Sequence, residues 1–96
     1  MTDSIDPISA AVGRRLREIR EAKGMSQDKL AASSGLHRTY IGRVERGEAN
    51  ITIKSFYRIC AALDILTTEI LAEEFVRRHK EFEAEFRKRR EPPNSS

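Results

Sequence analysis

Four polar side chains stand close together in the stretch GLHRTYIGRVERGEAN, which covers residues 35–50. They are His37, Arg38, Thr39 and Arg43, and each can donate hydrogen bonds. If the stretch is helical, the apolar residues Leu36, Ile41 and Val44 take one side of the helix and leave the donors on the open side. Gly42 also falls on that open side. The open side is therefore short, flat and rich in donors, which suits hydrogen-bond acceptors.

Two short helices around a glycine are expected to hold this surface in place. Ser26 is a good N-cap for the first, which runs from about Gln27 to Ser34, and Asp28 suits its positive end. Gly35 supplies the positive φ that the turn needs, and Ala31 stands where a larger side chain would push the two helices apart. The core-facing residues are Leu30, Leu36, Ile41 and Val44. This is the helix-turn-helix arrangement, whose second helix presents its outer face to the major groove of DNA.

The rest of the chain is also periodic in the way of helices, and no segment of adequate length alternates as a strand would. The first helix is expected to follow Asp6-Pro7 and to end near Gly24, with one apolar face made of Ile8, Val12, Leu16 and Ile19. Thr52 caps a fourth helix, whose core face is Phe56, Ile59, Cys60 and Leu63. Asp64 is expected in the left-handed conformation, and a fifth helix begins about Thr67. The sequence thus predicts an all-α fold of five helices.

Composition limits the classes of protein to consider. The 96 residues suggest one domain, and a net charge of +3 is only mildly basic, so a nucleic-acid interpretation depends on where the charges lie. Cys60 is the only cysteine, which excludes an intrachain disulfide and fits a reducing cytoplasm. No apolar run approaches the ~18 residues of a membrane span, and the acidic start MTDSIDP is unlike a signal peptide. Without a zinc-ligand spacing, a nucleophile–base arrangement or a glycine-rich phosphate loop, we expect no enzyme and no cofactor.

The segment GMSQDKLAASSGLHRTYIGRVERGEANITI resembles the lambda-repressor-like (Xre) helix-turn-helix family. The resemblance covers roughly residues 14–71 and is carried by Gln27, Leu30-Ala31, Gly35-Leu36, Ile41, Val44 and Glu45-Arg46-Gly47. Within the family, HRTYIGRVERGEANITI is most similar to the controller proteins of restriction-modification systems. The resemblance implies a lambda-repressor-like domain of five helices over residues 7–72, with double-stranded DNA as its partner.

The resemblance also implies a role for each polar residue around the second short helix. Candidates for direct base readout are His37, Arg38, Thr39 and Arg43, because arginine can bond guanine with two donors and threonine can touch a thymine methyl. Candidates for phosphate contact are Gln27, Tyr40, Asn50, Thr52 and Lys54. Gln27 also braces the readout residues, and Gly42 would let the DNA approach closely. Arg20 and Glu45 match a family pair that ties the first helix to the third.

Each of these residues has a purely structural interpretation as well. Arg38 and Arg43 also fit an ordinary solvated surface, and His37 fits a residue that only starts its helix. Asn50 also fits a residue that fixes its loop. The ring of Tyr40 can pack on the domain while its hydroxyl meets DNA. Cys60, at a core spacing, is interpreted as an inert core thiol rather than a redox switch.

The fifth helix extends past the usual end of the family's domain and is expected to run to Arg90. One stripe of it, over residues 67–91, consists of Leu71, Phe75, His79, Phe82 and Phe86. The stripe can fold back on its own domain or meet a second copy, and the second is favoured because the domain already has a core. Four i,i+4 pairs leave the rest of the helix solvated: Glu73–Arg77, Glu74–Arg78, Glu83–Arg87 and Glu85–Arg89. Residues 92–96 are expected to form a disordered tail.

These features together predict a cytoplasmic transcriptional regulator that binds a near-palindromic operator as a homodimer. Repression by occluding a promoter and activation through polymerase contact are equally compatible with the residues. An alternative is an antitoxin, whose C-terminal helix would hold a partner toxin while the domain regulates its own operon.

Overall fold

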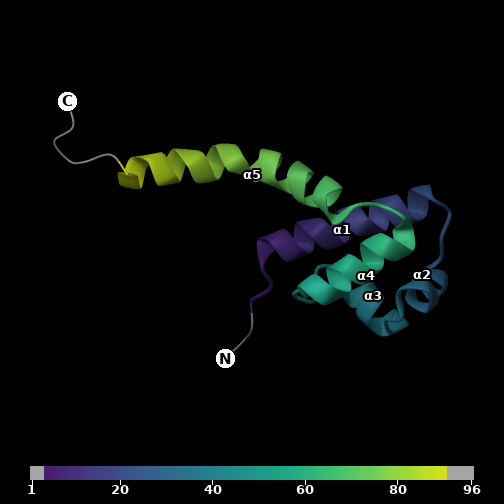
Figure 1. Ribbon diagram of the computed structural model, residues 1–96. Coiled ribbons are helices and arrows are strands. Elements are labelled where there is room, and N and C mark those ends of the chain that lie inside the picture. Colours follow the sequence, from purple (N-terminus) through teal and green to yellow (C-terminus); the bar gives the residue numbers. More distant parts are fainter. Residues whose placement is uncertain (1–3, 91–96) are drawn as a thin grey trace.

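The computed structural model describes residues 4–90, apart from the side chains of residues 75, 79–82, 85, 86 and 88–90. The described part contains five helices and no strands, which confirms the predicted all-α fold (Figure 1). The helices are α1 Pro7–Ala22, α2 Gln27–Ser34, α3 Arg38–Glu45, α4 Ile53–Leu63 and α5 Thr67–Arg90. The expected tail at residues 92–96 lies outside the described residues.

The helix ends follow from local sequence signals. The side chains of Asp6, Ser26 and Thr52 each accept a hydrogen bond from a backbone N–H in the first turn of the helix that follows. α1 ends in a Schellman turn, in which the N–H of Gly24 bonds Glu21 and that of Met25 bonds Arg20. Asp64 ends α4 with a φ of 59°, as predicted.

The core is a cluster of aliphatic side chains contributed by all five helices. The most deeply buried of them are Leu16, Leu30, Ile41, Val44, Ile59, Leu63 and Ile70. Cys60 lies among them, and burial raises the pKa of its thiol to about 11, which fits the predicted inert role. Ile8 departs from the predicted apolar face, because 46% of its surface stays exposed where the first turn of α1 reaches beyond the core.

A glycine allows α1 to approach α3. A Cβ built on Gly13 would overlap the carbonyl oxygen of Val44 and stand 2.9 Å from its carbonyl carbon. Any larger residue at this position would therefore push the two helices apart. The contact fixes how deeply α3 sits against the rest of the domain.

The first part of α5 folds back on the domain, and the remainder extends away from it (Figure 1). Ile70 and Glu74 are buried, and the Arg78 guanidinium donates to the carbonyl of Pro7 over 3.1 Å. The predicted pairs Glu74–Arg78 and Glu83–Arg87 are present. Glu73 pairs instead with Arg15 of α1 at 3.2 Å, so the predicted Glu73–Arg77 pair is wrong. The side chains of the predicted Glu85–Arg89 pair lie outside the described residues.

Candidate nucleic-acid interface

The turn between α2 and α3 has the predicted geometry. Gly35 adopts a φ of 72°, and its N–H and that of Leu36 both bond the carbonyl of Ala31, at 2.9 and 3.2 Å. A residue with a side chain would be strained in this left-handed conformation. Ala31 itself is buried between the elements, with 8% of its surface exposed. Gly35 therefore supplies the positive φ that the turn was predicted to need.

A buried cluster of polar side chains anchors the end of α3. Arg20 donates from Nε and Nη2 to the two oxygens of Glu45, at 2.7 and 3.0 Å, and from Nη1 to the carbonyl of Met25 at 2.7 Å. Hydrogen bonding to Glu45 raises the pKa of Arg20, against the opposing effect of burial. Gln27 donates from Nε2 to the same carboxylate at 2.9 Å. Gln27 thus braces the helix that carries the donors.

The predicted readout residues lie on the exposed side of α3. Arg38, Thr39 and Arg43 are all exposed, and His37 is the exposed N-cap residue, whose side chain makes no capping bond. The Arg38 guanidinium pairs with Asp28 of α2, with Nε 2.9 Å from Oδ1. The Arg43 guanidinium donates to the carbonyl of Glu48 at 3.2 Å. All three predicted donors of α3 are therefore exposed, and the two arginines have partners on neighbouring segments.

Gly42 does not form the open patch that the sequence suggested. It is buried, and a Cβ added to it would stand 2.9 Å from Nη1 of Arg46. The side chain of Arg46 therefore lies over this position. The prediction failed because helical spacing gives the direction of a residue, but it does not show that a longer neighbouring side chain turns back over it.

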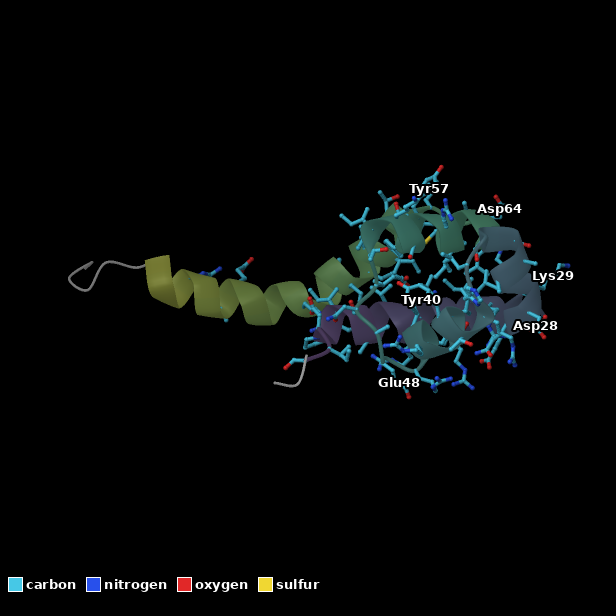
Figure 2. All side chains as sticks on the ribbon, turned by 90° about the horizontal axis from the view of Figure 1, so that it is seen from below. Asp28, Lys29, Tyr40, Glu48, Tyr57 and Asp64 are labelled. Atoms are coloured by element: carbon cyan, nitrogen blue, oxygen red, sulfur yellow. The ribbon has the colours of Figure 1, made fainter. Side chains whose placement is uncertain are left out.

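Two of the predicted phosphate contacts are used inside the protein. The Tyr40 ring packs against the core and its hydroxyl oxygen is buried without a hydrogen-bond partner, so in this conformation it does not reach the surface (Figure 2). The Asn50 side chain accepts from the N–H of Asp6 at 2.7 Å and donates to the carbonyl of Ser4 at 3.3 Å. Asn50 thereby fixes its loop to the segment before α1, which is its structural interpretation.

Thr52 and Lys54, two further predicted phosphate contacts, remain on the surface. The Thr52 hydroxyl caps α4 by accepting from the N–H of Ser55 at 3.0 Å. Lys54 is exposed in the first turn of the same helix. Ser9 also supports this region, because its hydroxyl accepts from the N–H of Ile51 at 3.1 Å. The loop between α3 and α4 is therefore held from two sides.

Several residues that support or form this surface were missed by the sequence reasoning. They are Gly13, Asp28 as a partner of Arg38, Arg46 and Glu48. A glycine in the middle of a helix is a signal that could have drawn attention to Gly13, since it costs stability unless packing requires it. Asp28 was assigned only to the helix end, and the partners of Arg46 and Glu48 depend on how the chain turns after α3.

The comparisons with known proteins agree with this geometry. The helix-turn-helix family matches residues 16–71. The control protein C.SmaI of Serratia marcescens is 37% identical over 67 residues, which make up 70% of this chain and 80% of that protein. The crystal structure of the restriction-modification controller protein C.AhdI from Aeromonas hydrophila is 47% identical with a TM-score of 0.62, and the match covers 65% of this chain and 94% of that chain.

A third relative was solved as an assembly. It is the restriction-modification controller protein C.Esp1396I, described as a tetramer in complex with its natural 35 base-pair operator. It is 36% identical with a TM-score of 0.66, and the match covers 74% of this chain and 97% of that chain.

Fold and sequence together define a helix-turn-helix protein with α3 in the place of the recognition helix. The chain belongs to the helix-turn-helix family, as the extent of the match and the identity to its relatives establish. Its relatives include controller proteins of restriction-modification systems, which confirms the predicted resemblance. The family is one of DNA-binding regulators and not of enzymes. Within residues 4–90, no helix is both long and apolar enough to cross a membrane.

Proposed function

We propose that this protein binds a specific duplex DNA sequence through α3 and regulates transcription as a homodimer. The observation that carries the proposal is the exposed row of Arg38, Thr39 and Arg43 on a helix held by a buried ion pair. Guanidinium and hydroxyl donors of this kind match the acceptors of base edges in the major groove. A rigid support lets their spacing select a sequence, because a mobile helix would accept many sites.

The relatives support the same proposal. C.SmaI is a control protein, and C.Esp1396I was crystallised with its natural operator. These relationships favour a regulator over the antitoxin alternative. No described feature of the chain supports that alternative. A cytoplasmic location follows from the proposed DNA partner. The candidate DNA-binding set of this proposal is Gln27, His37, Arg38, Thr39, Arg43, Thr52 and Lys54. Tyr40 and Asn50, whose side chains are buried or bonded within the protein, stay predictions as phosphate contacts.

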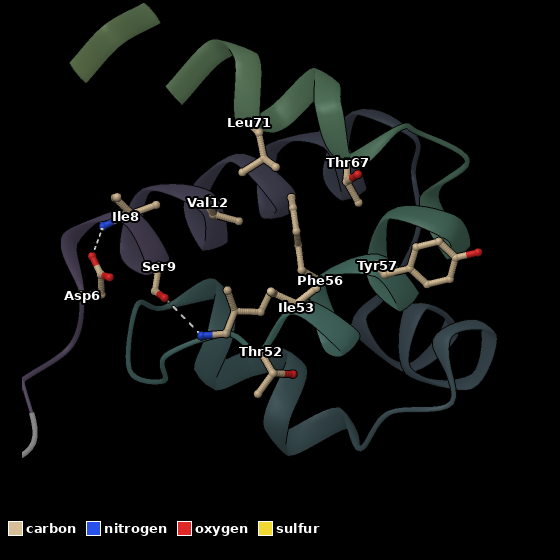
Figure 3. A pocket seen from close by; sticks show the side chains of 11 residues that line it. Asp6, Ile8, Ser9, Val12, Thr52, Ile53, Phe56, Tyr57, Thr67 and Leu71 are labelled. Atoms are coloured by element: carbon tan, nitrogen blue, oxygen red, sulfur yellow. Dashed lines mark hydrogen bonds between the residues drawn. The ribbon is translucent and has the colours of Figure 1, made fainter. Parts of the chain in front are cut away.

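An exposed apolar surface supports the proposed dimer. A groove of about 510 Å³ lies between the start of α1, α4 and the start of α5, and Ile8, Ile53, Phe56 and Leu71 surround it (Figure 3). Ile53 is 87% exposed, Tyr57 65% and Leu71 47%. Tyr57 points away from the domain on the side opposite Glu48 (Figure 2). A second copy that covered this groove would leave α3 free for DNA.

Of the five residues in the predicted dimer stripe, only Leu71 has a described side chain. Leu71 is exposed and lines the groove, as the dimer hypothesis requires. The side chains of Phe75, His79, Phe82 and Phe86 lie outside the described residues. We propose that the interface begins at the groove and continues along α5 toward its C-terminal end.

In vitro selection of bound duplexes by the purified protein tests the proposed function. We expect one enriched sequence with two similar half-sites, whose centres are about one DNA turn or roughly 34 Å apart. A variant with both Arg38 and Arg43 changed to alanine, selected in parallel, is the matched control and should enrich a less defined sequence. Recovery of random sequences by the wild-type protein would contradict sequence-specific binding. Enrichment of a single, unrepeated half-site would contradict the homodimer.

A further inference from the structure

Arg46 is exposed at the C-terminal end of α3. It follows Thr39 by seven residues, which is close to two turns of an α-helix, so the two residues lie on the same side. It is the C-cap residue of α3, with φ and ψ of −86° and 0°. Its Nη1 lies 2.9 Å from the point where a Cβ on Gly42 would stand. The guanidinium is therefore laid back along α3.

Glu48 holds this guanidinium in a defined orientation. Nε of Arg46 lies 3.0 Å from Oε2 of Glu48, and Nη2 lies 3.0 Å from Oε1, so the two planar groups meet through two parallel bonds. The hydrogen bond to Arg46 lowers the pKa of Glu48, as expected for a carboxylate that accepts from a guanidinium. The orientation of Arg46 is thus set by an ion pair and by the space that Gly42 leaves.

The backbone of Glu48 is also fixed, and it positions a second arginine. Gly47 turns the chain with a φ of 72°, and its N–H donates to the carbonyl of Val44 at 3.1 Å. The N–H of Glu48 donates to the carbonyl of Arg43 at 2.8 Å. These two bonds form a Schellman turn at the end of α3. The carbonyl of Glu48 then accepts from Nη2 of Arg43 at 3.2 Å. One residue therefore positions two arginines, one through its carboxylate and the other through its carbonyl.

We infer that Arg46 is a further base-reading residue of this protein and that Glu48 is the positioning residue that determines its specificity. This inference rests on the proposed DNA-binding function. With Nε and one Nη2 hydrogen engaged by Glu48, both hydrogens of Nη1 and one of Nη2 stay available. A pair of such donors in one plane matches the O6 and N7 acceptors of guanine, so a G·C pair is the expected target.

The Glu48 carboxylate has a second consequence for DNA binding. It cancels part of the Arg46 charge, and it repels DNA phosphates whatever the base sequence. Non-specific affinity comes mainly from attraction between basic side chains and phosphates, so the carboxylate lowers that affinity. Glu48 thereby favours discrimination between sequences over total affinity. Substitution of Glu48 should therefore raise non-specific affinity and lower discrimination between sequences. Substitution of a residue with only a structural role would not change these two quantities in opposite directions.

The experiment measures the affinity of four variants for three kinds of duplex. The duplexes are the best site from selection, the same site with each base pair changed in turn, and an unrelated sequence of the same length. The variants are Glu48→Gln, Arg46→Ala, Gly42→Ala and the double variant with Glu48→Gln and Arg46→Ala. Gly42→Ala crowds Nη1 of Arg46 without harming the helix, because alanine is the better helix former.

Glu21→Gln is the matched control for the loss of charge. Its carboxylate pairs with Arg17 of α1 at 3.2 Å and stands 4.0 Å from Nη2 of Arg20, whose main partner is Glu45. The Glu21 and Arg17 side chains are both 53% exposed, against 52% and 54% for Arg46 and Glu48. Both substitutions thus remove one exposed carboxylate from an arginine pair. Only Glu48→Gln removes it from the α3 surface. Thermal unfolding followed by circular dichroism confirms that every variant is folded.

We expect Glu48→Gln to bind the unrelated duplex several-fold more tightly and to lose about tenfold in discrimination at one base pair. Arg46→Ala and Gly42→Ala should lose discrimination at the same base pair, and the double variant should lose no more than Arg46→Ala alone. Glu21→Gln should leave the preference at every position unchanged.

Two outcomes would overturn the inference in distinguishable ways. If the wild-type protein discriminates between sequences and Glu48→Gln or Arg46→Ala keeps the full preference at every position, only the role of this pair is wrong. If the wild-type protein does not discriminate at all, the proposed function fails and the inference fails with it.

Discussion

The guanidinium of Arg20 on α1 and the carboxylate of Glu45 on α3 meet through two bonds of 2.7 and 3.0 Å in the interior of the domain. Gln27 of α2 adds a third bond to the same carboxylate. Three helices that are separate in sequence are thus joined at one buried charge. Because a buried charge is costly without its partner, this cluster fixes the orientation of α3 more firmly than surface contacts could.

The first prediction concerns this cluster. Arg20→Ala leaves the Glu45 carboxylate buried without its counter-charge, and we expect the free energy of unfolding to fall by about 3–5 kcal/mol. Urea unfolding followed by circular dichroism measures the loss. Arg17→Ala breaks an exposed pair with Glu21 and should cost no more than about 1 kcal/mol. Similar small losses for both variants would mean that the cluster does not anchor α3.

The second prediction concerns base readout by the donors of α3. Arg38→Ala or Arg43→Ala should cost roughly 1–3 kcal/mol of binding free energy on the best site and relax discrimination at one or two base pairs. The reason is that each exposed guanidinium can make a directional pair of bonds to a base. Titration of the selected site and its single-base variants measures both effects, with Arg17→Ala as a control away from α3. The assignment of this face is wrong if both variants keep wild-type affinity and preference.

The third prediction separates a phosphate contact from a structural bond. Lys54 is exposed in the first turn of α4, so Lys54→Ala should weaken binding to all sequences equally and reduce the salt slope by about one. Asn50→Ala removes two bonds to the segment before α1 and should instead lower the free energy of unfolding by about 1 kcal/mol. Its salt slope should match that of the wild-type protein. A reduced salt slope for Asn50→Ala would support the phosphate contact that the sequence predicts.

The fourth prediction concerns the buried hydroxyl of Tyr40. The oxygen has no hydrogen-bond partner, so Tyr40→Phe removes an unsatisfied polar group and should raise the free energy of unfolding by up to about 1 kcal/mol. DNA affinity should not change, because the hydroxyl does not reach the surface. Tyr57→Phe, on an exposed side chain, should change neither quantity. A selective loss of DNA affinity in Tyr40→Phe would mean that the side chain turns outward in the complex.

The helix ends could be predicted from the sequence because their signals are local. Ser26 and Thr52 each cap an N–H group three positions further along the chain. Gly35 and Asp64 take left-handed conformations that few other residue types accept. Helical periodicity likewise identified the core faces of α3 and α4. The pair Arg20–Glu45 could be found only through the family resemblance, since nothing local relates residues on different helices.

Contacts between distant segments were beyond the reach of the same reasoning. Asn50 bonds Asp6 across 44 positions, and Arg15 bonds Glu73 across 58, so both depend on how the helices are arranged. Gly13 is needed only because α3 approaches α1 at that point. Arg46 covers Gly42 because a charged partner two residues later orients its side chain. These corrections change which residues of the α3 surface are free to contact DNA.

The last prediction concerns the proposed dimer. Leu71 and Tyr57 lie on two helices that border one apolar groove, and fully burying such side chains contributes about 1.5–3 kcal/mol each. In a two-fold dimer every contact occurs twice, so charges placed in the groove should strongly weaken the association of the two copies. We expect the double variant with Leu71→Glu and Tyr57→Glu to be a folded, helical monomer. Ala22→Glu adds one charge at the other end of α1 from the groove and should remain dimeric.

Sedimentation equilibrium beside DNA titration provides the measurement. The wild-type protein should be dimeric at tens of micromolar without DNA, and the monomeric variant should bind a single half-site only weakly, because it loses the linked second contact. A wild-type protein that stays monomeric under these conditions would contradict the dimer itself. A double variant that stays dimeric would instead remove the groove from the interface and leave the stripe at Phe75, Phe82 and Phe86 as the surface to change next.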